Sequence, residues 1–179
     1  IACGPEIKVL PLIAPMWHKF QTTCSKSLGE YHLTPQDIND IFGQMMLSLM
    51  EKYRKQSGKP RLAEKSPNNV FYFQHLHIIF PDSPLIHIIR DGRDVVCSLL
   101  KMDWINPETG QPIDYTQDAG KAAAYWATAI QTAETAKQNP SASRQYREIH
   151  YEDLVTTPEP TLKELFAFIA EPWDPSVME

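Results

Sequence analysis

An arginine and a serine flank a turn in the middle of the chain, at a spacing suited to binding an anion. Residues 85–89 are a short apolar and β-branched run, which predicts a buried strand. Arg90 follows directly, and Ser98 lies one to two turns into the helical pattern that comes next. The N-terminus of a helix attracts anions, and a guanidinium offers a fork of donors that fits a phosphate. Arg90 and Ser98 are therefore candidate phosphate ligands.

The acidic residues of the same turn allow a second interpretation. Arg90 and Arg93 could pair with Asp91 and Asp94 on a solvated turn, where such ion pairs contribute little. Asp91 or Asp94 could also cap the helix, because a carboxylate can accept a hydrogen bond from a free N–H group. On local chemistry alone, the phosphate site and the solvated turn both stay open.

The composition is that of an ordinary globular protein and excludes several classes of function. The 179 residues are 42% hydrophobic and 22% charged, and they suffice for one buried core. The formal net charge of −5 argues against a surface for nucleic acid or anionic membranes, so a phosphate site has to be local. No apolar run approaches the ~18 residues of a membrane span, and no signal-peptide pattern occurs.

The cysteines suggest neither a disulfide framework nor a metal site. Cys3, Cys24 and Cys97 form no CxxC or cysteine–histidine spacing, and three cysteines cannot all pair within one chain. This usage favours a reducing compartment such as the cytoplasm. Cys97 stands among apolar residues of the helix after the strand, so we expect a buried thiol.

Strand and helix patterns alternate along the chain, which predicts an α/β domain with a mainly parallel sheet. The predicted strands span about 61–65, 85–89 and 146–151. The predicted helices span 7–20, broken or kinked by Pro11 and Pro15, and 34–57, 66–80, 115–138 and 157–169. A loop at 103–112 and a turn at 139–143 connect some of these elements.

Motifs around these elements resemble those of sulfotransferases that use 3′-phosphoadenosine 5′-phosphosulfate (PAPS). The segment from Arg90 to Ser98 resembles the family's 3′-phosphate signature, where a strand ends in Arg-Asp-x-Arg-Asp and a serine follows eight residues after the first arginine. Further segments match in the same order along the chain: residues 3–11, 64–68, 150–154 and 172–177. The first and last of these are similar to the protein-tyrosine branch of the family. The resemblance thus covers nearly the whole chain.

The resemblance implies a P-loop-NTPase-like sulfotransferase fold, with a central, mainly parallel sheet flanked by helices. Residues 1–179 would form a single, partial domain, truncated at the first strand. The family's Gly-rich 5′-phosphosulfate loop precedes the segment that residues 3–11 resemble, and these 179 residues contain no such glycine cluster. We therefore expect little transferase activity from these residues alone.

The resemblance also implies roles at the donor. Arg90, Ser98 and Tyr151 would bind the 3′-phosphate of PAPS and of its product, adenosine 3′,5′-bisphosphate; the alternative for Tyr151 is that it anchors the strand at 146–151. Lys65 would stabilise charge on the oxygens of the leaving group; the alternative is an ion pair with Glu64. Sulfuryl transfer resembles phosphoryl transfer in depending on positioning and charge stabilisation, and we expect no metal.

At the acceptor, the resemblance makes Glu6 the general base and places Lys8 toward the acceptor. The alternative for Glu6 is that it caps a helix beside Pro5. Leu12 and Met102 replace arginines of the protein-tyrosine branch, so we expect a weak attraction for acidic peptides. The expected acceptor is the hydroxyl group of a small molecule or a peptide, with a tyrosyl residue as one candidate.

The cysteine that would pair with Cys3 in the protein-tyrosine branch is Ala63 here, which argues against that disulfide.

The sequence leaves two alternative functions open. A P-loop kinase-like enzyme needs Gly-Lys followed by Ser or Thr, but Lys59 and Lys121 are followed by Pro60 and Ala122. A degenerate nucleotide-binding module would bind adenosine 3′,5′-bisphosphate and transfer nothing.

Overall fold

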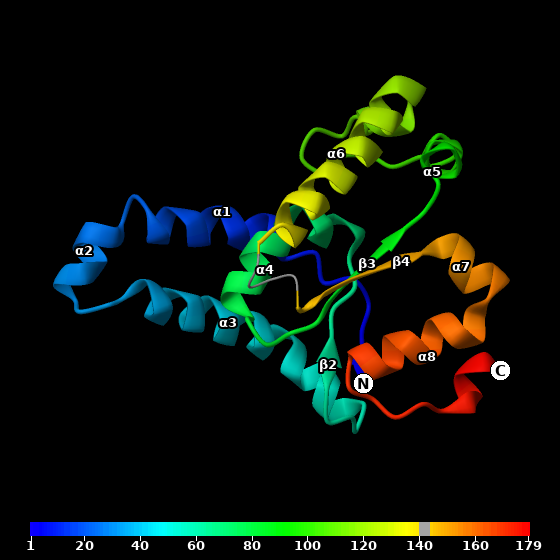
Figure 1. Cartoon of the computed structure of the whole chain (residues 1–179). Helices are drawn as coiled ribbons and strands as arrows, with labels where there is room; N and C mark the ends of the chain where they lie inside the picture. Colours follow the sequence, from blue (N-terminus) through cyan, green and yellow to red (C-terminus); the bar gives the residue numbers. More distant parts are fainter. Residues whose placement is uncertain (140–143) are drawn as a thin grey trace. The chain divides into compact units, whose positions relative to one another are not determined.

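In the computed structural model, strands alternate with helices along the chain and pair in parallel, as the sequence predicts for an α/β fold (Figure 1). The structure describes residues 1–139 and 144–179, so most of the turn predicted at 139–143 lies outside the described residues. The chain divides into two units, Ile1–Ser83 and Pro84–Glu179.

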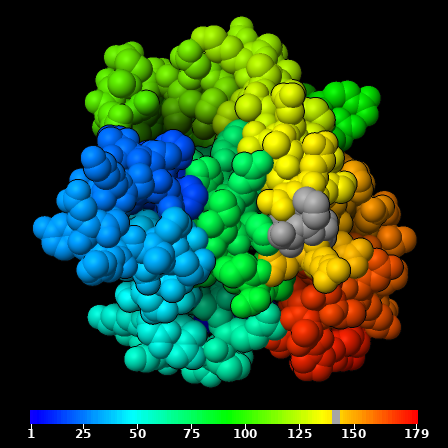
Figure 2. All heavy atoms as spheres, turned by 60° about the vertical axis from the view of Figure 1, so that its left-hand side comes forward, coloured from blue at the N-terminus to red at the C-terminus, as the bar shows by residue number. Residues whose placement is uncertain are grey.

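The first unit contains one short pair of strands and a helical core. β1 (Ala2–Cys3) pairs in parallel with β2 (Leu62–Ala63). The helices are α1 (Leu10–Gln21), α2 (Ser25–Glu30), α3 (Pro35–Gln56), η1 (Pro67–Tyr72) and α4 (Phe73–Ile79). α1 packs against α2 and α3, which run from blue to cyan in Figure 2. The buried core residues are Leu10, Ile13, Trp17, Ile38, Phe42, Met46 and Ile79.

In this unit, α3 has a capped N-terminus and α1 continues through an interior proline. α3 begins with a capping box, in which the Thr34 hydroxyl accepts from the Asp37 N–H and the Asp37 carboxylate accepts from the Thr34 N–H. The predicted break in α1 is wrong, because the helix continues through Pro15. Burial of Leu10, Ile13 and Trp17 on one face opposes the cost of the interior proline.

The second unit is built on a longer pair of strands. β3 (Leu85–Ile89) and β4 (Tyr146–His150) run in parallel, with Leu85 opposite Tyr146 and Ile89 opposite His150 (Figure 1). The helices are α5 (Gly92–Leu99), η2 (Asp114–Thr116), α6 (Ala119–Lys137), α7 (Tyr151–Thr156), α8 (Pro158–Phe168) and η3 (Pro175–Met178). β3, β4, α5, α6 and α8 agree with the prediction to within a few residues, whereas α7 and η3 were not predicted.

A line of hydrogen bonds fixes the pairing of β3 with β4. His87 Nδ1 lies 2.8 Å from the Tyr146 hydroxyl, which donates to Glu148 at 2.9 Å. Lys137 of α6 donates to the other oxygen of Glu148 at 2.7 Å. Burial raises the pKa of Tyr146 and lowers that of His87, so both stay neutral near pH 7. A shift of one residue in the strand register would break this line.

The predicted burial of Cys97 is wrong, because its side chain is exposed. Cys97 stands two positions from both Val95 and Leu99, which places it about 200° around the helix from the apolar side.

Among the helices that the structure describes, none combines the length and the apolar character needed to cross a membrane.

We expect Thr34→Ala to lower the free energy of unfolding by about 1 kcal/mol, because the substitution removes the N-cap of α3. Urea unfolding followed by circular dichroism measures the change. Ser48→Ala on the same helix is the control and should be close to neutral, because the Ser48 hydroxyl only bonds back to the Gln44 carbonyl. Equal effects of the two substitutions would contradict the assigned cap.

Candidate functional site

The turn after β3 is organised by Asp91, which caps α5. Its carboxylate accepts a hydrogen bond from the Arg93 N–H at 2.8 Å, so Asp91 and not Asp94 is the cap. The Arg93 guanidinium lies 2.6 Å from the same carboxylate. Hydrogen bonds from Arg93 lower the pKa of Asp91 to about 2. Arg93 is therefore engaged within the turn, as the solvated-turn interpretation predicts.

Arg90 is held less completely than Arg93. Its Nη2 lies 3.3 Å from Asp94 Oδ2 in an ion pair between exposed side chains, which contributes little to stability. Its guanidinium carbon lies 4.9 Å from the centre of the Tyr151 ring, within the range of a cation–π interaction. Its Nε is buried and has no hydrogen-bond partner among the described residues. Arg90 thus keeps a donor for a further acceptor.

The structure brings Arg90 and Tyr151 together, but among the described residues neither forms a hydrogen bond with Ser98. Ser98 lies in the last turn of α5 and is half-buried. Its hydroxyl makes no recorded hydrogen bond to another described residue, which leaves it available to a ligand. The predicted ligands of the 3′-phosphate are therefore all in the second unit: Arg90 directly follows β3, Tyr151 directly follows β4, and Ser98 lies in α5.

Glu6 lies between two lysines in the first unit. Its Oε1 is 3.3 Å from Lys65 Nζ, and its Oε2 is 3.5 Å from Lys8 Nζ. Both lysine side chains are largely exposed, whereas that of Glu6 is 29% exposed. The structure therefore brings the predicted base, the predicted cation and Lys8 into one cluster.

The alternative roles of the first-unit residues are wrong. Glu6 does not cap α1, which starts after Val9 and has no acidic residue in its first turn. Lys65 pairs with Glu6 and not with Glu64, whose carboxylate accepts hydrogen bonds from Ser66 and Asn69.

Tyr53 supports the segment that carries Glu6, and sequence reasoning missed it. The Tyr53 hydroxyl donates to the Cys3 carbonyl at 3.4 Å. A Cβ on Gly4 would lie 3.3 Å from the Tyr53 ring, so the glycine allows this close approach. Tyr53 continues the apolar pattern of α3 in the sequence, and nothing local indicates that it reaches β1.

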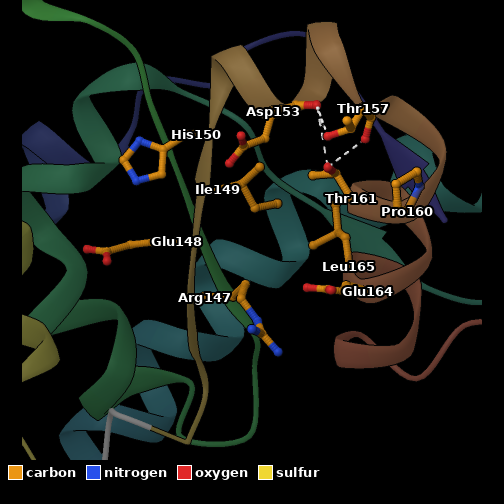
Figure 3. A pocket seen from close by; sticks show the side chains of 10 residues that line it. All are labelled: Arg147, Glu148, Ile149, His150, Asp153, Thr157, Pro160, Thr161, Glu164 and Leu165. Atoms are coloured by element: carbon orange, nitrogen blue, oxygen red, sulfur yellow. Dashed lines mark hydrogen bonds between the residues drawn. The ribbon is translucent and has the colours of Figure 1, made fainter.

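A separate pocket of about 280 Å³ lies between β4 and helices α7 and α8 (Figure 3). It is lined by Arg147, Glu148, Ile149, His150, Asp153, Thr157, Pro160, Thr161, Glu164 and Leu165. None of these is a predicted site residue, and Thr161 bonds back to its own helix, to the Thr157 carbonyl at 2.7 Å. Among residues 1–139 and 144–179, no three acidic, histidine or cysteine side chains are placed to hold a metal ion.

Comparison with known proteins matches nearly the whole chain to one family. A model described as the sulfotransferase family matches residues 9–175. The protein-tyrosine sulfotransferase of Drosophila melanogaster is 26% identical over 99% of this chain and 34% of its own length. Protein-tyrosine sulfotransferase 1 of Danio rerio is 27% identical over 99% of this chain and 48% of its own length. The chain thus spans about a third to a half of the length of these relatives.

A solved structure supports the predicted fold. The sulfotransferase domain from the curacin biosynthetic pathway matches with a TM-score of 0.61 and 21% identity, over 97% of this chain and 66% of that one. At this identity the likeness concerns the fold alone. The predicted P-loop-like α/β fold with parallel strands is confirmed.

We expect Asp91→Asn to destabilise the protein at pH 7, with a difference that shrinks as the pH falls. The pKa of Asp91 is lowered from 3.8 to about 2 in the fold, so its carboxylate stabilises the fold above pH 4. That contribution is lost as the pH falls through about 2, whereas asparagine still caps the helix.

Urea midpoints of both proteins at pH 7, 4, 3 and 2 measure this difference. Asp103→Asn, in an exposed loop without a recorded ion pair, is the control for loss of a carboxylate. A difference of constant size down to pH 2 would show that the Asp91–Arg93 pairing is not its cause.

Proposed function

Because the chain belongs to the sulfotransferase family, we propose that its protein transfers a sulfuryl group from PAPS to a hydroxyl acceptor. We propose further that residues 1–179 form part of a single domain of that enzyme. The observation that carries the proposal is Arg90, which follows β3, begins the segment that resembles the 3′-phosphate signature and keeps an unpartnered buried donor. The family match gives no support to the kinase-like alternative.

At the donor end, Arg90, Ser98 and Tyr151 bind the 3′-phosphate in this proposal. A phosphate carries more charge than the Asp94 carboxylate and offers more acceptor oxygens, so it would displace the exposed 3.3 Å ion pair. The Tyr151 ring, 4.9 Å from the guanidinium carbon, holds the guanidinium from one side. The free Ser98 hydroxyl adds a neutral donor, which contributes less than the arginine.

At the reacting end, Glu6 takes the proton of the acceptor hydroxyl as that oxygen bonds to sulfur. The bond between sulfur and the bridging phosphate oxygen breaks, and Lys65 stabilises the charge that this oxygen gains. The products are a sulfate ester and adenosine 3′,5′-bisphosphate. In-line transfer places the entering and leaving oxygens on opposite sides of one sulfur atom. The base acts at the entering oxygen and the cation at the leaving oxygen, so both have to lie near that one atom. The 3.3 Å contact of Glu6 with Lys65 supports these roles.

The names of the relatives support a tyrosyl residue as the acceptor. Lys8, which is 73% exposed, is the residue proposed to face it. Leu12 lies on α1 with 72% of its surface exposed. It thus presents an apolar side chain at the position where the protein-tyrosine branch has an arginine. The electrostatic attraction for acidic flanking residues is weak in this proposal, and a hydroxyl group on a small molecule remains a candidate acceptor.

We expect Arg90→Ala to weaken the binding of adenosine 3′,5′-bisphosphate by roughly 1.5 to 3 kcal/mol, because a charged donor to the phosphate is lost. Titration calorimetry on the intact protein measures the affinity. Arg147→Ala is the matched control and should leave this affinity unchanged, because Arg147 lies on β4 and its guanidinium is over the Phe168 ring. Unchanged affinity of the Arg90 variant would reject the phosphate site.

We expect Glu6→Gln to lower kcat by about 10² to 10⁴ and to leave the affinity for adenosine 3′,5′-bisphosphate unchanged, because the amide cannot take the acceptor's proton. The assay follows labelled PAPS with the best acceptor among acidic tyrosyl peptides, neutral phenols and sugars.

Glu30→Gln, at an exposed site on α2, is the control for the Glu6 variant. A protein that binds adenosine 3′,5′-bisphosphate but transfers sulfate to no acceptor would be a binding module. A preference of a hundredfold or more for acidic peptides would contradict the weak attraction expected from Leu12 and Met102.

A further inference from the structure

Trp126 of α6 lies directly against the turn that carries Arg90. Its indole Nε1–H donates to the Arg90 carbonyl at 3.1 Å. A Cβ placed on Gly92 would lie 2.9 Å from the indole ring, closer than real Cβ atoms come to other atoms. The absence of a side chain at Gly92 therefore lets the ring rest on the main chain of the turn.

Glu152 of α7 holds the same turn from a second element. Its Oε1 accepts a hydrogen bond from the Asp91 N–H at 2.9 Å. This hydrogen bond lowers the pKa of Glu152, so the carboxylate stays charged at neutral pH. Glu152 is also the neighbour of Tyr151, whose ring lies against the Arg90 guanidinium.

The three residues of the turn are thus each held from outside it. Trp126 binds the carbonyl of Arg90 and covers Gly92, and Glu152 binds the N–H of Asp91. None of these contacts touches the Arg90 side chain, whose Nε has no hydrogen-bond partner among the described residues.

We propose that Trp126 and Glu152 are positioning residues, which fix the main chain of residues 90–92 so that the Arg90 side chain meets the phosphate of the donor. The inference rests on the proposed role of Arg90. A guanidinium binds phosphate well only when its planar fork is aligned, and a turn that is already ordered avoids the cost of ordering on binding. Without the two contacts, the turn relaxes and the Arg90 fork loses its alignment.

The test is a double-mutant cycle that combines Trp126→Phe with Arg90→Ala. The phenylalanine keeps an aromatic ring on α6 but loses the N–H donor to the Arg90 carbonyl. Calorimetry with adenosine 3′,5′-bisphosphate on the intact protein gives the affinities. We expect Trp126→Phe to weaken binding about fivefold when Arg90 is present and less than about twofold in the Arg90→Ala background.

If Trp126 only stabilised the fold in general, Trp126→Phe would lower the affinity by the same factor in both backgrounds. Trp173→Phe is the matched control and should not change the affinity, because Trp173 packs on Phe166 of α8. If Trp126→Phe lowers the affinity equally in both backgrounds, or does not lower it at all, the inference is overturned. The phosphate site itself still stands in that case, provided that Arg90→Ala weakens binding. If Arg90→Ala itself has no effect, the phosphate site and the inference both fail.

Glu152 supplies a second pair of variants that does not depend on the indole. Glu152→Gln keeps an oxygen that can accept from the Asp91 N–H, so its affinity should stay within about twofold. Glu152→Ala removes the acceptor and should weaken binding about fivefold, again only when Arg90 is present. Equal affinities of the alanine and glutamine variants would overturn the role of Glu152.

Discussion

The parallel pairing of β3 with β4 is the constraint on which the donor residues depend. Ile89 lies opposite His150, so the next residue of each strand, Arg90 and Tyr151, leaves the same end of the pair. Their cation–π contact at 4.9 Å follows directly from this register. Because side chains alternate between the faces of a strand, a shift of one residue would separate them.

The first unit uses the same arrangement on a smaller scale. Cys3 lies opposite Ala63 in parallel strands, and Glu6 and Lys65 follow within three residues of the strand ends and meet at 3.3 Å. In open α/β sheets, ligands bind at the carboxyl ends of the strands, which agrees with both clusters. Each turn is also supported by an aromatic ring against a glycine, supplied by α3 for Gly4 and by α6 for Gly92.

The sequence by itself determined the local structure and the candidate residues. The β-branched run at 85–89, the Thr-Pro start at 34–35 and the choice of Asp91 or Asp94 as the cap of α5 each depend on groups only a few residues apart, so local patterns predict them. Only the structure selected Asp91. The motifs carried the resemblance to sulfotransferases, which the family match at 9–175 confirmed. They also selected Arg90 and Glu6 for chemistry, and those roles remain proposals.

Only the tertiary structure decided which partners these residues have. Lys65 pairs with Glu6, 59 residues away, because strand pairing brings the two residues together. The adjacent Glu64 instead accepts hydrogen bonds from Ser66 and Asn69. The contact of Trp126 with the turn at Arg90 joins positions 36 residues apart, and no local pattern indicates it. Such contacts depend on strand register and helix packing. Both are set by many interactions between residues far apart in the chain, so a short stretch of sequence does not indicate them.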